Sequence, residues 1–172
     1  IRYGLGAIKG VTRSVELDAD ALVVGMIGRL VQEKGYREFF HAARAIRSRR
    51  SDVVFLAVGP SDPDKGDAIS QGEREAASSD VVFTGYRGDV RDLLAMFDVF
   101  VLPSWREGMP RSAIEAASMG RAMVLTDIRG CREVGRDGVE ALLVPPRDPL
   151  ALTRAIDRLL EDPDVRARMS RA

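Results

Sequence analysis

Two carboxylates, Glu107 and Glu115, bracket a short turn in the stretch E-G-M-P-R-S-A-I-E, residues 107–115. The turn follows an apolar run, 99–103, and leads into a helix of small residues that Gly120 ends. Where a buried strand ends in such a turn and opens a helix, free backbone N–H groups lie at the carboxyl end of the strand. Carboxylates beside those amides would accept hydrogen bonds from sugar or ribose hydroxyls. The stretch therefore predicts half of a ligand site.

A structural interpretation of the same stretch stays open beside the ligand interpretation. Ser112 and Glu115 have the spacing of a capping box, and Arg111 with Glu115 could form a surface pair worth about 0.2–0.5 kcal/mol. Pro110 suits a first helical position, because its missing N–H is not needed there. The amides available to an anion would then belong to Gly108, Met109, Arg111 and Ser112.

Two cations follow the first apolar run, in the segment G-R-L-V-Q-E-K-G, residues 28–35. After Gly28, Arg29 offers a planar fork that matches phosphate oxygens, and Lys34 offers a flexible point charge. Together they would clamp a diphosphate; the alternative is a pair of solvated loop charges. The chain has no G-x-G-x-x-G and no G-x-x-x-x-G-K-[ST] motif, so neither a dinucleotide oxidoreductase nor a P-loop nucleotidase is indicated.

Other polar residues carry weaker signals. The only histidine, His41, is expected to be a surface or half-buried helix residue, because no Ser, Cys or metal-ligand pattern accompanies it. The aspartates of segment 61–72 lack the bidentate Glu of a calcium loop, so we interpret them as solvated charges and expect no metal site. Tyr86 and Arg87 follow the third apolar run and could cover a flat ring, or could form an ordinary exposed strand end.

The composition bounds the class of protein. The chain has 172 residues, with Lys+Arg 26 and Asp+Glu 26, so a formal net charge of zero offers no reason to expect a nucleic-acid partner. One cysteine, Cys131, excludes an internal disulfide and a thiolate metal cluster and fits a reducing compartment. No stretch approaches the roughly 18 apolar residues of a membrane helix, and the first residues lack the pattern of a signal peptide, so we expect neither. Because the chain begins without Met and ends inside a helical pattern, we expect a piece of a longer protein.

Apolar runs alternate with amphipathic helical patterns along the chain. We expect strands over 21–28, 53–58, 81–84, 99–103, 122–126 and 141–144. Helices are expected over about 36–50, 73–78, 89–97, 113–119 and from 148 onward with a break at 162–163, and a loop containing Gly130 is expected between the last two strands. This alternation predicts an α/β fold with a doubly wound, Rossmann-like, six-stranded parallel sheet and helices on both faces. Ligands bind such sheets at the carboxyl ends of strands, where Gly28, Gly59 and Glu107 are expected.

Taken together, the motifs resemble the C-terminal, nucleotide-sugar-binding domain of family 4 retaining glycosyltransferases, the group 1 type with a GT-B fold. The resemblance covers nearly the whole chain from about Leu22 and looks most like bacterial capsule, exopolysaccharide and O-antigen transferases. It is carried by the 28–35 segment, by F-T-G-Y-R (83–87), by V-L-P-S-W-R-E-G-M-P (101–110) with the two glutamates, and by T-D-I-R-G-C-R-E-V (126–134) followed by D-G and L-L-V-P-P.

The resemblance implies a role for each matching residue. Arg29 and Lys34 would bind the donor diphosphate, Glu107 the hydroxyls of the donor sugar, and Glu115 the ribose. The resemblance also places Tyr86 and Arg87 beside the base. Amides near Gly108, Met109 and Arg111 would meet sugar or phosphate oxygens. The implied ligand is a nucleoside-diphosphate sugar, with a UDP-sugar favoured, and no metal or other cofactor is expected.

The resemblance also implies a missing half. Residues 1–20 would be an interdomain connection and 21–172 the donor domain, with the N-terminal acceptor domain absent, so this fragment alone is expected to be inactive. The full-length protein would move a hexose-type sugar to a glycan or lipid-linked acceptor in polysaccharide biosynthesis. It would be cytoplasmic, and any contact with the inner membrane face would be made by the full-length protein or its lipid-linked acceptor. The alternatives are a sugar-nucleotide epimerase of GT-B fold and a non-catalytic binding module.

Overall fold

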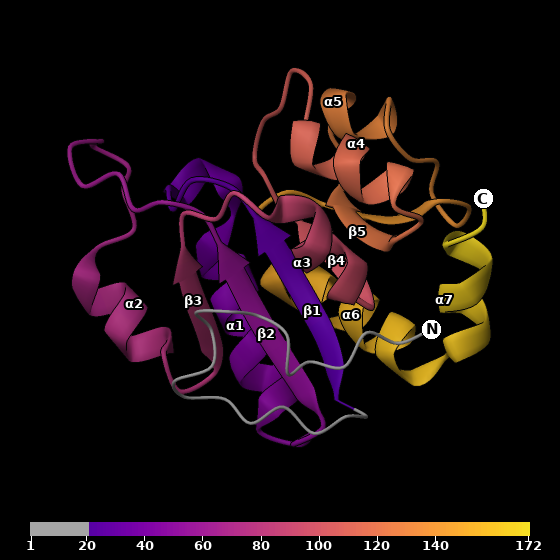
Figure 1. Cartoon of the computed structure of the whole chain (residues 1–172), viewed down its shortest axis with the longest axis horizontal. Helices are drawn as coiled ribbons and strands as arrows, with labels where there is room; N and C mark the ends of the chain where they lie inside the picture. Colours follow the sequence, from indigo (N-terminus) through magenta and orange to yellow (C-terminus); the bar gives the residue numbers. More distant parts are fainter. Residues whose placement is uncertain (1–20) are drawn as a thin grey trace.

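The apolar runs of the sequence form six parallel strands in the computed structural model, which describes residues 21–172 (Figure 1). The strands are β1 (Leu22–Ile27), β2 (Val53–Val58), β3 (Val81–Gly85), β4 (Val99–Leu102), β5 (Ala122–Thr126) and β6 (Ala141–Val144). Side chains of β2, β4 and β5 are buried throughout, as expected for parallel strands that helices cover on both faces.

Helices form a layer on each face of the sheet (Figure 1). Helices α1 (Tyr36–Arg47), α6 (Pro149–Glu161) and α7 (Pro163–Met169) pack on one face, in one hydrophobic cluster. Helices α3 (Val90–Met96), α4 (Arg111–Ser118) and α5 (Arg129–Arg132) pack on the other face, in a second cluster. A helix beside the edge strand β3, α2 (Gln71–Ala77), and a short 3-10 helix, η2 (Gln32–Lys34), complete the described part.

The strand order reverses direction at the centre of the sheet, between the paired strands β1 and β4. The order is β3-β2-β1-β4-β5-β6, so the chain winds outward from β1 in one direction and from β4 in the other. The segments that follow β1 and β4 lead to helices on opposite faces, and ligands bind sheets of this kind at the carboxyl ends of two such strands, a place that we call the crevice. The prediction of a doubly wound parallel sheet is confirmed, and Lys34 and Glu107 lie beyond the carboxyl ends of β1 and β4.

Gly35 brings the segment after β1 against the end of β4. It ends η2 and begins α1 with a φ of 80°, in the left-handed region that glycine adopts without strain. A β-carbon at this position would lie 2.1 Å from the carbonyl oxygen of Pro103, so the two backbones are in contact there. This contact holds the η2 turn, and with it Lys34, beside the β4–α4 connection.

Some expected element boundaries were wrong. Helix α1 ends at Arg47 rather than near Arg50, and a four-residue helix, α5, forms where a loop was expected. Helix α2 begins earlier than expected, because Ser70 and Glu73 form a capping box at its start. The expected connection over residues 1–20 lies outside the described residues.

Candidate functional site

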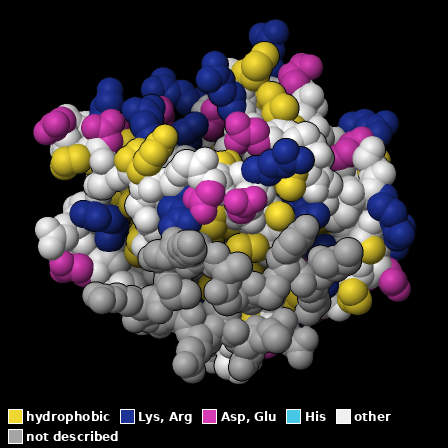
Figure 2. Space-filling model, in the orientation of Figure 1, with side chains coloured by type: hydrophobic (Ala, Val, Ile, Leu, Met, Phe, Trp, Pro, Cys, Tyr) yellow, Lys and Arg dark blue, Asp and Glu magenta, His cyan; other side chains and the backbone are white. Residues whose placement is uncertain are grey.

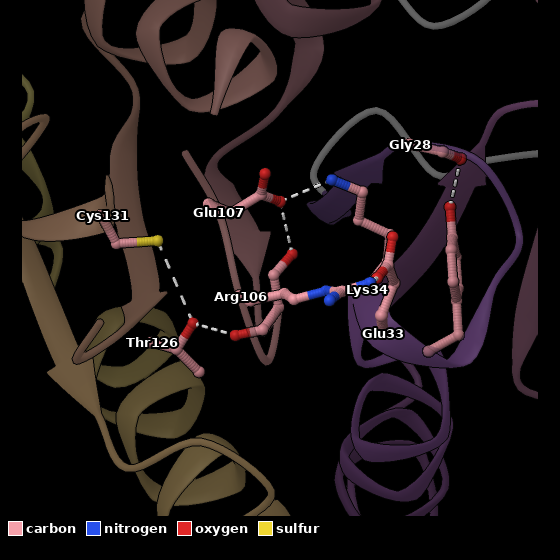
Figure 3. Close-up of polar contacts among 9 residues, drawn as sticks. Gly28, Glu33, Lys34, Arg106, Glu107, Thr126 and Cys131 are labelled. Carbon is pink, nitrogen blue, oxygen red and sulfur yellow. Dashed lines mark hydrogen bonds and ion pairs between the residues drawn. The ribbon is translucent and has the colours of Figure 1, made fainter. Parts of the chain in front are cut away.

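An ion pair joins the two halves of the sheet at the crevice. The Nζ atom of Lys34 lies 2.6 Å from Oε1 of Glu107, and the two side chains are only 21% and 9% exposed (Figure 3). Such a partly shielded pair is stronger than one in open water. Two residues that the sequence marked separately as phosphate and sugar ligands therefore lie in direct contact.

The backbone around η2 positions this pair. The Trp105 amide donates to the Glu33 carbonyl oxygen at 2.8 Å, and the Arg106 guanidinium pairs with the Glu33 carboxylate at 2.8 Å. On the other side, the Tyr36 hydroxyl donates to the Gly28 carbonyl oxygen at 2.7 Å. Burial raises the pKa of Tyr36, so its hydroxyl stays protonated and able to donate even at alkaline pH. These bonds fix η2 between the ends of β1 and β4.

A buried serine holds the carboxylate of Glu107 from behind. Ser104 is fully buried, and its hydroxyl donates to Oε1 of Glu107 at 2.8 Å. The Thr126 hydroxyl donates to the Ser104 carbonyl oxygen at 2.5 Å, and the Cys131 sulfur lies 4.0 Å from the same hydroxyl (Figure 3). The orientation of Glu107 is thus set by groups from the ends of β4 and β5 and from α5.

Arg29 lies on the same edge but has a different partner. Its guanidinium is 3.5 Å from the Asp62 carboxylate, and its side chain is 48% exposed. An exposed pair of this length contributes little and leaves the guanidinium accessible to an anion. Figure 2 shows Lys and Arg side chains gathered along the upper edge, above the carboxyl ends of the strands in Figure 1, with Asp and Glu side chains among them.

The first turn of α4 is open at its N-terminus. Pro110 is the N-cap residue and no side chain caps the helix, so the capping box of Ser112 and Glu115 that stood as the alternative does not form. Pro110 therefore precedes the helix instead of occupying its first position. The Ala113 and Ile114 amides donate to the Pro110 carbonyl oxygen, which leaves the Arg111 and Ser112 amides to donate to a ligand anion. Gly108 and Met109, just before it, are exposed.

Glu115 lies apart from the ion pair, in a pocket of about 410 Å³ between α3 and α4. Its carboxylate makes no hydrogen bond or ion pair that joins it to Arg111 or to another residue in the part of the chain that the structure describes. Opposite it the pocket is lined by Gly88, Val90 and Arg91. A pocket of this volume, lined by a carboxylate and an arginine, can accommodate a ribose and a base.

Three residues predicted beside the ligand lie as follows. Arg87 hydrogen-bonds the Asp89 carboxylate, at 2.8 Å from Nε and 2.5 Å from Nη2, which lowers the pKa of Asp89. Tyr86 is 78% exposed and, with Arg87, is not among the residues that line the pocket. Gly59 has a φ of 150°, and a β-carbon there would lie 1.9 Å from the Gly28 carbonyl oxygen. Only glycine therefore lets the ends of β1 and β2 meet.

The remaining candidates lie away from this site or have other partners. His41 is exposed on α1, and Asp62 pairs with Arg29. Within residues 21–172, no three His, Cys, Asp or Glu side chains are grouped closely enough to hold a metal ion.

Two features were missed in the sequence. Ser104, two residues after β4, carried no signal of its own, although a polar residue directly after a buried strand and Pro103 could have marked it. The pocket residues Gly88, Val90 and Arg91 lie just beyond Tyr86 and Arg87. Gly88, a glycine just before a short helix, could have indicated that the base contact belongs to these residues and not to Tyr86 and Arg87.

Comparison with known proteins identifies a family. The model described as glycosyl transferases group 1 matches residues 21–162. A curated relative, N,N'-diacetylbacillosaminyl-diphospho-undecaprenol alpha-1,3-N-acetylgalactosaminyltransferase from Campylobacter jejuni, is 31% identical over 159 residues, which are 92% of this chain and 40% of the relative. The chain thus spans less than half the length of this relative.

Solved structures share the fold. Anabaena Alr3699/HepE, 25% identical over 88% of this chain and 42% of its own, superposes with a TM-score of 0.79 in its UDP complex and 0.78 in its UDP-glucose complex. The C-terminal domain of the LpcC group 1 family protein from Francisella tularensis superposes with a TM-score of 0.76 at 22% identity, over 87% of this chain and 80% of that domain. No helix within residues 21–172 is long and apolar enough to cross a bilayer.

Proposed function

This chain belongs to the glycosyl transferases group 1 family, and from that membership we propose that its crevice binds the nucleoside-diphosphate sugar of a hexosyl transfer reaction. The observation that carries the proposal is the Lys34–Glu107 pair at the switch point of the sheet. It combines a cation for phosphate with a carboxylate for hydroxyls, which is the chemistry that a sugar nucleotide requires at its glycosidic end.

Each chemical group of the donor is assigned to residues at the carboxyl ends of the strands. Lys34 and Arg29 bind the diphosphate, and the open amides at the start of α4 contribute to the same anion. Glu107 accepts hydrogen bonds from the sugar hydroxyls. Glu115 accepts from the ribose hydroxyls in the pocket between α3 and α4, where Arg91 faces the base. The UDP and UDP-glucose complexes of HepE support a UDP-sugar as the donor.

The same groups suit the chemical step. Glycosyl transfer passes through an oxocarbenium-like state in which negative charge grows on the departing phosphate. Cations and amides that are already fixed at that position stabilise the charge where it develops, without reorganisation. Lys34 and Arg29 supply this stabilisation from side chains of this chain.

The acceptor is assigned to another part of the full-length protein. A donor domain that spans 40% of a curated relative leaves room for an acceptor domain, to which residues 1–20 would connect. The name of that relative, whose acceptor is a diphospho-undecaprenol-linked sugar, supports a lipid-linked glycan as the acceptor class. The isolated chain is therefore expected to bind donor and to transfer no sugar.

Calorimetric titration of this chain with UDP, GDP and ADP tests the donor site. UDP is expected to bind, and Arg29→Ala and Glu115→Ala are each expected to weaken UDP binding at least about 10-fold, because each removes a charge-assisted contact worth about 1.5–3 kcal/mol. Arg154→Ala and Glu161→Ala change exposed charges on α6, away from the edge, and serve as matched controls.

Two results would contradict the proposal. One is the absence of binding by any of the three nucleotides at millimolar concentration. The other is equal binding by the edge variants and the α6 controls. Sugar transfer by this chain alone, measured with UDP-glucose and a lipid-linked acceptor, would instead contradict the assignment of the acceptor site to another domain.

A further inference from the structure

We propose that Ser104 is a positioning residue that orients the Glu107 carboxylate toward the donor sugar, and that Thr126 holds Ser104 in place. The inference rests on the proposed function, since it gives a role to the side chains behind the carboxylate that binds the sugar there. Neither Ser104 nor Thr126 is accessible to a ligand, since the two residues are 0% and 1% exposed.

The two oxygens of Glu107 have different surroundings. Oε1 accepts from the Ser104 hydroxyl at 2.8 Å and from the Lys34 ammonium at 2.6 Å. Figure 3 shows the second oxygen, Oε2, turned away from both of these bonds. The carboxylate is therefore held by one oxygen and presents the other, which leaves Oε2 as the acceptor for a sugar hydroxyl.

A second hydroxyl fixes the first. The Thr126 hydroxyl has one hydrogen, and it is donated to the Ser104 carbonyl oxygen at 2.5 Å. The Cys131 sulfur, 4.0 Å away, can then act only as a donor to the Thr126 oxygen. Burial raises the pKa of Cys131 to about 11, which keeps the thiol protonated for this purpose. The backbone at Ser104 is thus tied to the end of β5 and, through Cys131, to α5.

This arrangement has a consequence for binding. A glutamate on an open loop would lose side-chain freedom when it bound a sugar, whereas Glu107 has already lost it in the folded chain. Ser104 should therefore contribute to the affinity for the sugar and not to the affinity for the nucleotide, because Lys34 and Arg29 hold the diphosphate independently of Oε2. This selectivity separates a positioning role from a general structural role.

The test compares UDP with UDP-glucose, UDP-galactose and UDP-N-acetylglucosamine by calorimetric titration of this chain. The wild type is expected to bind at least one of the UDP-sugars more tightly than UDP. Ser104→Ala is expected to weaken the binding of that UDP-sugar about 10-fold, because it removes one hydrogen bond to a charged group. The affinity for UDP is expected to change less than about 2-fold. Thr126→Val, which keeps the side-chain volume, is expected to show the same selectivity, and Thr126→Ser, which keeps the hydroxyl, to restore wild-type binding.

The outcomes distinguish this inference from the donor site itself. If the wild type binds UDP and a UDP-sugar, but Ser104→Ala and Thr126→Val weaken both equally or neither, the positioning role is wrong and the donor site stands. If the wild type binds every UDP-sugar no better than UDP, Glu107 does not contact the sugar and the inference also fails. If the wild type binds no nucleotide, the proposed function fails first and the inference with it. Thermal unfolding of each variant confirms that binding is measured on folded protein.

Discussion

Lys34 and Glu107 lie 73 positions apart in the chain, yet the Lys34 Nζ is 2.6 Å from the Glu107 Oε1. Lys34 follows β1 and Glu107 follows β4, so the pair spans the point where the winding of the chain reverses. Without a ligand, each group supplies the counter-charge of the other. The Lys34 ammonium has three donor hydrogens, so a diphosphate can accept those that Glu107 does not take, and the pair persists when UDP binds.

Lys34→Ala is expected to affect both binding and stability. UDP affinity should fall at least about 10-fold, because a hydrogen bond between charged groups contributes about 1.5–3 kcal/mol. The free energy of unfolding should fall by about 1–3 kcal/mol, since within residues 21–172 the Glu107 carboxylate then keeps only the hydroxyl of Ser104 as a partner. Calorimetry and urea denaturation measure the two effects. Lys65→Ala removes an exposed lysine from the segment after β2 and should change neither; equal results for the two variants would contradict the placement of Lys34.

Gly130→Ala is expected to disturb the turn that carries Glu107. A β-carbon on Gly130 would lie 2.5 Å from the Glu107 carbonyl oxygen, so α5 or the turn must move. Such overpacking costs about 1–3 kcal/mol of unfolding free energy, and UDP-sugar affinity should fall with it. Gly72→Ala is the matched control, because nothing lies within 4 Å of its β-carbon and it sits in α2. It should be stabilising by about 0.5–1 kcal/mol in urea denaturation. Similar free energies for the two variants would contradict the close approach.

Much of the fold is predictable from sequence for a simple physical reason. All six strands lie within one residue of the expected ranges, because each is a short apolar run that a turn residue or a polar residue ends. The four-residue helix α5 was missed, because so short a segment shows no helical period. The order of the strands depends on how the chain crosses from one strand to the next, and the apolar runs do not contain that information.

The candidate site was predictable residue by residue but not as an arrangement. Lys34 and Glu107 were each expected to bind ligand, whereas their ion pair depends on the contact between Gly35 and Pro103, which no local pattern reveals. The capping alternative for Ser112 was wrong because α4 begins at Arg111, which leaves Ser112 inside the helix and unable to cap it.

Arg147 gives a test of backbone strain beside the site. It is the one residue other than glycine with a positive φ in the described chain, at 61°, and its guanidinium lies 4.3 Å from the centre of the Trp105 ring. Arg147→Gly and Arg147→Ala both remove the cation–π contact, but only glycine adopts this backbone conformation without strain. The glycine variant should therefore be more stable by about 1 kcal/mol in urea denaturation followed by circular dichroism. At Arg154, inside α6, the same two substitutions should give the opposite order; the same order at both positions would contradict the strain at Arg147.

Cys131 predicts a dependence of stability on alkaline pH. Burial raises the pKa of its thiol from 9.0 to about 11, so the folded chain favours the neutral form more than the unfolded chain does. The contribution of the thiol to stability is therefore complete below about pH 9 and is lost as the pH rises toward 11. Two pKa units correspond to a loss of at most about 3 kcal/mol in the free energy of unfolding.

Urea denaturation of the wild type and of Cys131→Ala between pH 8 and 11 isolates this contribution, because the buried Tyr36 titrates in both proteins. The difference in unfolding free energy between the two should shrink above pH 9, since only the wild type has a thiol to ionise. Alkylation by iodoacetamide at pH 8 gives an independent reading: the folded wild type should react far more slowly than the urea-unfolded chain. Equal rates would mean that the thiol is exposed, and it would then be unable to support the Thr126 hydroxyl behind Ser104 and Glu107.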